Sequence, residues 1–340
     1  MITASVPPRH LETRTWQQEL AEAITCPEEL AAVLGLSPAA FAGAREAGRH
    51  FRLQVPRSFV SRMRPGDPRD PLLLQVLPDA AELADAAGYG ADPVGESSAR
   101  RAPGLLQKYR GRALLITTPA CAVHCRYCFR REFPYAQQGG EAPRWREALA
   151  EIAADASLEE VLLSGGDPLS LSNARLESLT RELAGIPHVR RIRVHTRQPV
   201  VLPSRVDEGL TRWLRGSPLP IVFVLHINHP NELDGQLIAA CARLRATGVT
   251  LLNQSVLLAG VNDEAEVLAQ LSLRLFEAGV LPYYLHALDR VKGAAHFIVP
   301  DERARALAGE LSARLPGYLV PRLVREVAGA PSKIPLGATF

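Results

Sequence analysis

The chain has 340 residues, 47% of them hydrophobic, and 39 basic against 36 acidic side chains give a net charge of +3. This composition predicts a globular protein with a large core, either one barrel-like domain with an extension or two ordinary domains. The weak, dispersed positive charge does not indicate nucleic-acid binding. The sequence has neither an apolar run long enough to span a bilayer nor a basic-then-apolar leader. We therefore expect a cytoplasmic protein with no membrane contact.

The first part of the chain, to about residue 110, has amphipathic helical patterns such as Thr15–Leu34, interrupted by the Pro-rich stretch Arg57–Pro71. From Arg112 onward, short apolar runs alternate with longer amphipathic segments, which is typical of β-α units around a parallel sheet. Strands are expected at 113–117, 160–163, 191–194, 221–226, 250–257 and 282–287, and helices near 145–155, 173–184, 204–214, 232–246, 263–278 and 301–314. A last apolar run, Tyr318–Val327, precedes a C-terminal loop.

Three of the five cysteines, Cys121, Cys125 and Cys128, directly follow the first expected strand. Thiolates are the usual ligands of a four-iron cubane cluster, and a loop that offers three of them leaves one iron free to bind another molecule. Zinc with His124 as the fourth ligand is the minor alternative, because a residue between two ligands reaches the metal poorly.

A disulfide framework is the other alternative for these cysteines. It needs an oxidising compartment and an even set of cysteines, whereas Cys26 and Cys241 stand alone in a long chain. The cluster is therefore the favoured interpretation.

The segment Ser164–Leu169, with sequence Ser-Gly-Gly-Asp-Pro-Leu, follows the second expected strand. In a barrel of β-α units, the loops at the C-terminal ends of the strands converge on one mouth. Adjacent glycines let the backbone approach a ligand closely, with N–H groups exposed. Alone, the segment is an ordinary turn, but beside the cysteine loop it indicates a ligand site.

The C-x3-C-x2-C spacing with an aromatic residue before the last cysteine resembles the radical S-adenosylmethionine (SAM) enzymes, whose free iron chelates the methionine moiety. Further segments make the chain similar to the lysine 2,3-aminomutases from about residue 100 to the end. These segments are Tyr109–Ile116, Cys125–Arg131, Ser164–Leu169, Arg197–Arg205, His226–Asn231, Asn253–Leu258, Gly260–Asp263 and Pro282–Asp289.

The resemblance implies an α/β fold, a partial (β/α)6 barrel of the radical SAM type over 106–317. An N-terminal mainly helical extension covers 1–105, and a C-terminal strand and pyridoxal 5'-phosphate (PLP) loop covers 318–340. It further implies a [4Fe-4S] cluster on the three clustered cysteines, with SAM and PLP as organic cofactors. The cofactor contacts it implies are Ser164, Gly165, Gly166, Asp167, His226, Gln254, Lys108, Arg112, Tyr283 and Lys333.

The PLP aldehyde must be held by a primary amine as an imine. Lys333 matches the family position, and the chain has only two other lysines, Lys108 and Lys292. A solvated surface lysine is the ordinary alternative. Lys108 and Arg112 match the family's basic residues for the phosphate, although relatives often have arginine at the first position. Tyr283 is equally consistent with lying against the pyridine ring and with ordinary packing.

Substrate selection follows from charge, because free lysine presents a carboxylate and a distant ammonium group. Arg130 matches the family position that binds the substrate carboxylate, while Asp289 and Glu326 match the acidic positions that bind the ammonium group. Glu326 is one methylene longer than the aspartate of longer relatives, and surface ion pairs are the alternative for all three side chains. The anionic Asp289 argues against glutamate as the substrate.

Within the family, the chain most resembles the short branch that forms (R)-β-lysine from L-α-lysine for modification of elongation factor P. The features are Phe129–Tyr135, Arg325–Leu336 and the end of the chain at Phe340. This likeness implies an isomerase with a flavodoxin- or ferredoxin-type electron donor and a functional link to elongation factor P and its lysyl-ligating enzyme. Longer relatives bind zinc through a tail and a cysteine matching Cys241, which we predict here to be a buried helix cysteine without zinc.

In the mechanism that the resemblance implies, the reduced cluster splits SAM and the deoxyadenosyl radical removes hydrogen from C3 of lysine, after which nitrogen moves to C3. A metabolic 2,3-aminomutase acting on free lysine, or less favourably on arginine or glutamate, is the alternative enzyme. An iron-sulfur sensor is the non-enzymatic alternative, but it would need neither Lys333 nor Arg130 nor Asp289. Homo-oligomerisation, product configuration and the reductant are left open by the sequence.

Overall fold

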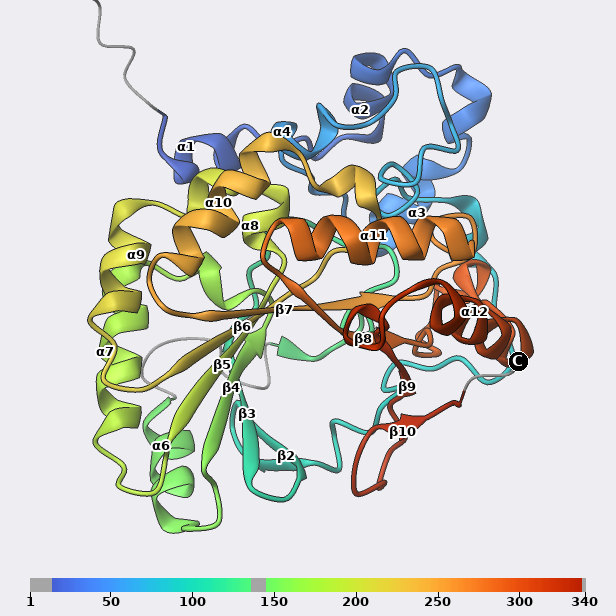
Figure 1. Cartoon of the computed structure of the whole chain (residues 1–340). Helices are drawn as coiled ribbons and strands as arrows, with labels where there is room; N and C mark the ends of the chain where they lie inside the picture. The colour runs from blue at the N-terminus through green and yellow to red at the C-terminus, as the bar shows by residue number, and fades with distance from the viewer. Residues whose placement is uncertain (1–13, 136–144, 338–340) are drawn as a thin grey trace, which may run out of the picture.

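The computed structural model describes residues 14–135 and 145–337. One curved sheet, whose strands follow one another in chain order from β1 to β10, carries helices on its outer side (Figure 1). Strands β3 to β9 are parallel, and antiparallel pairs extend the sheet at both ends. The first and last strands are not paired with each other, so the barrel is open. The predicted partial barrel of β-α units is confirmed.

The strands are β1 Arg100–Ala102, β2 Leu105–Tyr109, β3 Arg112–Thr118, β4 Glu160–Gly165, β5 Arg191–Thr196, β6 Ile221–Leu225, β7 Thr250–Val256, β8 Leu281–His286, β9 Arg322–Arg325 and β10 Ile334–Pro335. The helices are α1 Trp16–Ala21, α2 Pro27–Leu34, α3 Ala44–His50, α4 Arg57–Val60, α6 Trp145–Ala154, α7 Asn173–Ala184, α8 Gln198–Val201, α9 Glu208–Arg215, α10 Gly235–Arg245, α11 Ala265–Glu277 and α12 Asp301–Arg314. Every strand expected from the β-α pattern is present, and the apolar run 318–327 contains β9.

The amphipathic stretch Thr15–Leu34 forms two helices, α1 and α2, instead of one continuous helix. The second helix begins at Pro27, whose ring has no N–H to continue a preceding helix but fits a first turn. Between the two helices, Ile24 pairs with Val55 in an antiparallel bridge. The amphipathic pattern indicated helix over this stretch but not the break between the two helices.

Helices α9 and α10 begin a few residues later than their amphipathic patterns suggest. Asp207 accepts a hydrogen bond from the Leu210 N–H at 2.6 Å, and Asp234 accepts one from the Leu237 N–H at 2.8 Å. A carboxylate that caps the first turn in this way fixes the helix start. On α10, Cys241 is fully buried, which confirms that it is a buried helix cysteine.

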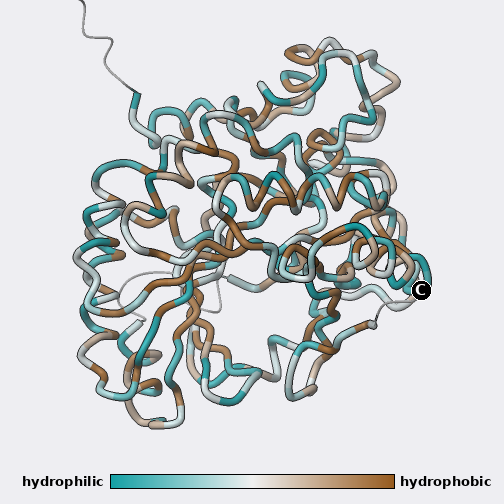
Figure 2. Tube along the Cα trace, in the orientation of Figure 1, coloured by the Kyte–Doolittle hydropathy of each residue, from teal (hydrophilic) through white to brown (hydrophobic). Residues whose placement is uncertain are grey.

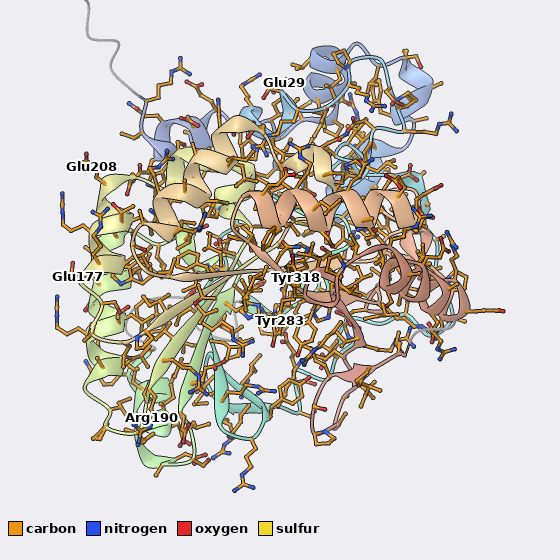
Figure 3. All side chains as sticks on the ribbon, in the orientation of Figure 1. Glu29, Glu177, Arg190, Glu208, Tyr283 and Tyr318 are labelled. Carbon is orange, nitrogen blue, oxygen red and sulfur yellow. The ribbon has the colours of Figure 1, made fainter. Side chains whose placement is uncertain are left out.

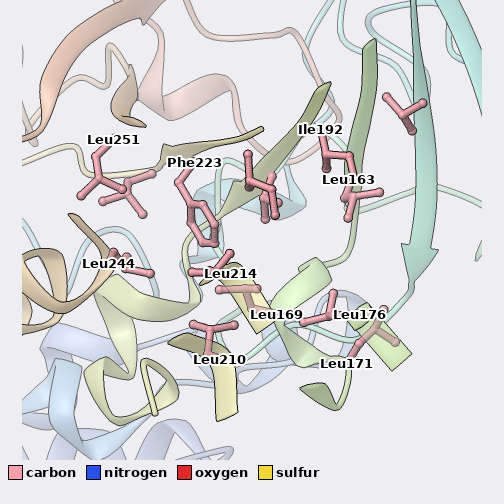
Figure 4. Packing of buried hydrophobic residues seen from close by; sticks show 14 of the residues in the cluster. Leu163, Leu169, Leu171, Leu176, Ile192, Leu210, Leu214, Phe223, Leu244 and Leu251 are labelled. Atoms are coloured by element: carbon pink, nitrogen blue, oxygen red, sulfur yellow. The ribbon is translucent and has the colours of Figure 1, made fainter. Parts of the chain in front are cut away.

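The main core lies between the sheet and its outer helices. Leu163, Ile192 and Phe223 from neighbouring strands pack with Leu176 and Leu214 from α7 and α9 (Figure 4), and hydrophobic residues follow the central strands in Figure 2. Each such side chain contributes about 1.5–3 kcal/mol when buried. Because successive side chains of a strand point to opposite faces, the inner face of the sheet is left for other residues.

The N-terminal extension has a core of its own that reaches the cysteine loop. Ile24, Phe59 and Leu72 belong to the same buried cluster as Ala122 and Val123, which lie between the first two clustered cysteines. The extension therefore supports the loop directly. The division at residues 105 and 317 remains a prediction, and β2 runs across the first of these positions. None of the helices within the described residues is long and apolar enough to cross a membrane.

Candidate active site

The inner face of the sheet and the loops after its parallel strands line a cavity of about 690 Å³. Along β5, Ile192 and Val194 are buried in the core, while Arg193 and His195 line the cavity. Tyr283 lies near the middle of the molecule in Figure 3. The structure brings every predicted site residue to this one cavity: Cys121, Cys125, Cys128, Lys108, Arg112, Arg130, Ser164, Gly165, Gly166, Asp167, His226, Gln254, Tyr283, Asp289, Glu326 and Lys333.

The loop that carries the three clustered cysteines is held by the N-terminal extension. The His124 N–H donates to the Gln54 carbonyl at 3.0 Å, and the Arg126 N–H donates to the Gln75 carbonyl at 2.9 Å. The His124 ring, considered as a zinc ligand, has its Nδ1 hydrogen-bonded to the Arg52 carbonyl at 2.9 Å. That nitrogen is therefore engaged by the extension.

Two of the clustered cysteines, Cys121 and Cys128, lie in an environment that disfavours the free thiolate. Burial raises the pKa of Cys121 well above its ordinary value, and burial together with the charge of Cys125 raises the pKa of Cys128 to about 11. The Cys121 and Cys128 thiols of the metal-free protein are thus protonated near neutral pH and release protons when they bind metal.

A single metal ion and a cubane iron-sulfur cluster place different demands on these three thiols. Within the described ranges, no group of three or more His, Cys, Asp or Glu side chains is arranged to hold a single metal ion. A cubane cluster does not need such a group, because each thiolate binds a different iron. Three cysteines in one loop supply such thiolates and leave one iron of the cluster open.

The glycine pair after β4 differs from the sequence prediction in one respect. The Gly166 N–H is not exposed, because it donates to the Thr118 carbonyl, and the next N–H, that of Asp167, donates to the Ala120 carbonyl, both at 2.7 Å. A Cβ atom at Gly165 would lie 2.7 Å from the Thr118 oxygen, and one at Gly166 would lie 2.3 Å from the Ala120 oxygen. Glycine is required because the loops after β3 and β4 touch here, which sets the position of the cysteine loop.

Asp167 connects the loops after β4 and β5. Its carboxylate accepts hydrogen bonds from the Thr196 hydroxyl at 2.7 Å, from the Arg197 N–H at 2.8 Å and from the Leu169 and Gln198 N–H groups at 3.0 Å each. Burial nevertheless raises its pKa. Both oxygens are used within the protein, so a direct contact of Asp167 with a cofactor remains a prediction.

Arg130 forms a buried ion pair that the sequence does not predict. Its Nε and Nη2 donate to the two carboxylate oxygens of Glu96 at 2.8 and 2.7 Å. Its Nη1 donates to the Ser164 hydroxyl at 2.9 Å and to the Gly165 carbonyl at 3.3 Å. Glu96 thus fixes one edge of the guanidinium, and the other edge has only uncharged partners. Fork-to-fork pairing of this kind holds the group rigidly.

Glu326 joins the two cavity lysines. It accepts a hydrogen bond from Lys108 Nζ at 2.7 Å and another from Lys333 Nζ. Burial alone would raise its pKa, but the charges of Lys333 and Lys108 outweigh burial and lower the pKa to about 2. In this state Glu326 is paired with lysines of the chain, which differs from its predicted role as a free partner for a substrate ammonium group.

One line of alternating charge crosses the cavity as a result. Lys108 Nζ also lies 3.5 Å from the Glu96 carboxylate that holds Arg130. The charges therefore alternate in the order Arg130, Glu96, Lys108, Glu326 and Lys333. Such an arrangement neutralises each buried charge through its neighbours.

Asp289 lies in the cavity beside this line. Burial, helped by the negative charge of Glu326, raises its pKa to about 7. Burial and the charge of Lys333 lower the pKa of His286 to about 3, and burial lowers the pKa values of His195 and His226 well below their usual range. These histidines are neutral near pH 7, whereas Asp289 changes charge there.

Several polar atoms in the cavity have no partner within the described part of the protein. Among them are His195 Nε2, His286 Nε2 and the Tyr109 hydroxyl, each a buried atom of a cavity-lining residue. Arg112 lies with its guanidinium carbon 4.8 Å from the centre of the Tyr109 ring. Buried polar groups are normally satisfied, so these atoms indicate that the cavity accepts a polar ligand.

Sequence reasoning missed Glu96, His195, His286 and Arg197 as parts of this cavity. Glu96 lies in an irregular segment between Pro93 and the first strand, where no periodicity marks it. The two histidines alternate with apolar residues on their strands, and this alternation is the signal that could have found them.

The comparisons with known proteins agree with this geometry. Residues 115–271 match the family model described as the Radical SAM superfamily. The protein named L-lysine 2,3-aminomutase from Escherichia coli is 48% identical over 99% of this chain and 97% of its own length. Proteins of the same name from Haemophilus influenzae, at 46% identity over 95% of each chain, and Clostridium subterminale, at 35% over 94% of this chain and 77% of its own, are also similar. The chain belongs to the L-lysine 2,3-aminomutase family.

Membership in this radical SAM aminomutase family makes the chain an isomerase that uses a [4Fe-4S] cluster and SAM. The cavity has the donors for a cluster, namely three partly buried thiols in one loop that contacts the N-terminal extension. It also has space for a nucleotide-sized ligand next to them. The family resemblance noted from the sequence is confirmed.

Proposed function

We propose that this chain is a PLP-dependent lysine 2,3-aminomutase that converts L-α-lysine to (R)-β-lysine for the modification of elongation factor P. The observation that carries the proposal is one cavity that contains three thiols, an amine and charged groups matched to both ends of lysine. The relatives named L-lysine 2,3-aminomutase support the reaction. The Phe129–Tyr135 and Arg325–Leu336 segments support the branch that serves elongation factor P.

Cys121, Cys125 and Cys128 would hold the cluster, with one iron left for SAM. The radical chemistry comes from the cluster and SAM together. The chain contributes a rigid loop, held by the N-terminal extension on one side and by the loop after β4 on the other. Burial of these contacts excludes water from the reacting groups.

PLP would be held by Lys333, with Lys108 and Arg112 for its phosphate. The unpaired Tyr109 hydroxyl, His195 Nε2 and His286 Nε2 give the cavity unused hydrogen-bonding capacity that fits a polar ring and its substituents. PLP supplies a conjugated ring that stabilises an unpaired electron next to nitrogen. The Lys333 amine must leave Glu326 when it takes up this role, which frees one carboxylate oxygen in the cavity.

Lysine would be recognised by charge at both of its ends. The Nη1 edge of Arg130 has only the Ser164 hydroxyl and a carbonyl as partners, so a substrate carboxylate can bind there while Glu96 keeps the other edge fixed. Asp289 and the freed oxygen of Glu326 would receive the ammonium group. A glutamate side chain would meet two carboxylates instead, which opposes its binding.

The decisive test is product formation by the anaerobically reconstituted enzyme. Incubation with lysine, SAM and dithionite should yield β-lysine, detected by chromatography on a chiral phase, and the configuration should be R. Arginine and glutamate in place of lysine serve as the comparison substrates. The proposal is refuted if lysine is not converted by protein that contains its full cluster and PLP.

The role in elongation factor P modification needs a separate measurement. Deletion of the gene in its host should leave elongation factor P without the mass of a β-lysyl group, and added (R)-β-lysine should restore that mass. A metabolic aminomutase would leave the mass of elongation factor P unchanged on deletion. A flavodoxin or ferredoxin would be the physiological electron donor in either case.

Asp289→Asn should raise the KM for lysine about 10- to 100-fold, because a hydrogen bond to a charged group contributes about 1.5–3 kcal/mol. The raised pKa of Asp289, about 7, adds a pH dependence. Below pH 7 the carboxyl group is mostly protonated and cannot pair with ammonium, so the wild-type KM should increase as the pH falls from 8 to 6. The asparagine variant should lose this dependence.

Binding of SAM, measured by equilibrium dialysis, is the control for Asp289→Asn. It should change little, because Asp289 is assigned to the lysine end of the cavity. Equal losses of lysine and SAM binding would point to misfolding and would contradict the assignment.

A further inference from the structure

Arg197 makes a contact with the cysteine loop that the proposed function does not use. It follows β5 directly and is 5% exposed. Its Nη1 donates to the Cys125 sulfur at 2.8 Å and to the Tyr127 hydroxyl at 2.6 Å. The guanidinium of a residue that follows β5 thus contacts a thiol in the loop that follows β3.

The rest of this guanidinium is fixed in a buried polar network. Its Nη2 donates to Gln75 Oε1 at 2.5 Å and to Glu232 Oε2 at 3.1 Å. The other oxygen of Glu232 accepts the Asn228 and His229 N–H groups at 2.9 and 3.1 Å. Glu232 is fully buried, so the charge of Arg197 is balanced from the side opposite Cys125.

The backbone of Arg197 is fixed as well. Its N–H donates to Asp167 Oδ2 at 2.8 Å, and the Asp167 N–H in turn donates to the Ala120 carbonyl in the loop that leads into the cysteines, at 2.7 Å. The side chain therefore has little freedom to turn away from Cys125.

We propose that Arg197 sets the reduction potential of the cluster by donating this hydrogen bond to the sulfur of Cys125. Hydrogen bonds to cluster sulfurs, together with nearby positive charge, favour the reduced cluster, which carries one more negative charge. Arg197 acts through Cys125 and need not touch the substrate. The inference depends on the radical SAM cluster and holds whichever amino acid the enzyme isomerises.

Arg197→Lys keeps the positive charge and removes the planar pair of donors that reaches Cys125 and Glu232 together. At a fixed potential, the ratio of reduced to oxidised cluster should fall about tenfold, which is a shift of about 59 mV for one electron. The ratio is measured by redox titration with electron paramagnetic resonance detection of the reduced cluster. Iron and sulfide content is determined on the same samples.

Arg62→Lys is the matched control. Arg62 is also a buried arginine, its Nη1 donates to the Glu232 carbonyl at 2.7 Å, and its Nε lies 3.1 Å from Asp234. Within the described part of the chain, its hydrogen bonds and ion pair are with Ser58, Glu232 and Asp234 and not with a cysteine. The control should leave the potential unchanged. An unchanged potential in fully loaded Arg197→Lys would overturn the proposal, and so would a loss of SAM affinity without a shift in potential.

A second measurement uses the unaltered holoenzyme, so it does not depend on how the variants fold. Protein labelled with nitrogen-15 in the guanidinium groups of arginine should show a weak nitrogen coupling to the reduced cluster in pulsed electron paramagnetic resonance. The absence of any such coupling would overturn the proposal even if Arg197→Lys failed to assemble a cluster.

Discussion

Cys128→Ser should fold but should contain no [4Fe-4S] cluster and should not cleave SAM. A hydroxyl replaces the thiol with nearly the same volume, and it does not supply the thiolate that iron in such clusters takes. Two remaining cysteines cannot hold a site-open cubane. Iron and inorganic sulfide per chain should fall to background after anaerobic reconstitution, together with the visible absorbance of the cluster. Lysine turnover should fall to background as well.

The two cysteines outside the loop provide matched controls. Cys26 is exposed at the start of α2, where serine is a good N-cap, so Cys26→Ser should keep both cluster and stability. Cys241 is buried in α10, so alanine disturbs this apolar position less than serine would. Cys241→Ala should therefore also keep the cluster. A cluster retained in Cys128→Ser, or lost in Cys26→Ser, would contradict the assignment of ligands.

Much of the fold is readable from the sequence because the parallel strands are buried and apolar. Runs such as 160–163 and 221–226 contain continuous hydrophobic residues that only a covered sheet accommodates. The antiparallel strands β1, β2 and β10 are short, and β1 and β2 carry polar residues, so the formation of all three depends on pairing with the barrel edges. Local patterns cannot specify such strands, since tertiary contacts decide them.

The active site likewise has a part that the sequence predicts and a part that it does not. From motif spacing and family likeness we predicted sixteen site positions, and all sixteen line one cavity. The partners of these residues were not predictable: Glu96 pairs with Arg130 across 34 positions of sequence, and Arg197 reaches Cys125 across 72. A buried charge needs a partner, but the sequence does not say which distant side chain supplies it. The expectation of exposed N–H groups at Gly165 and Gly166 was wrong for Gly166 for the same reason, because the carbonyl of Thr118 at the end of β3 accepts its N–H.

Lys333→Ala should abolish covalent attachment of PLP and reduce lysine turnover to background. Alanine has no amine to hold the PLP aldehyde, so the visible absorbance band of the protein-bound cofactor should disappear after reconstitution. Borohydride reduction of the wild-type holoenzyme should fix PLP to the peptide that contains Lys333, identified by mass spectrometry. The [4Fe-4S] cluster should remain in the variant, because Lys333 belongs to the other end of the cavity.

The scarcity of lysine makes this prediction unusually sharp, since the chain has only Lys108, Lys292 and Lys333. Lys292 is exposed and 3.7 Å from the exposed Asp85, so Lys292→Ala should leave PLP attachment intact. Lys333→Arg retains a positive charge next to Glu326 and therefore separates the ion pair from the covalent role. If arginine preserves the absorbance band, or if the reduced cofactor is found on Lys108, then Lys333 is a partner of Glu326 and not the anchor of PLP.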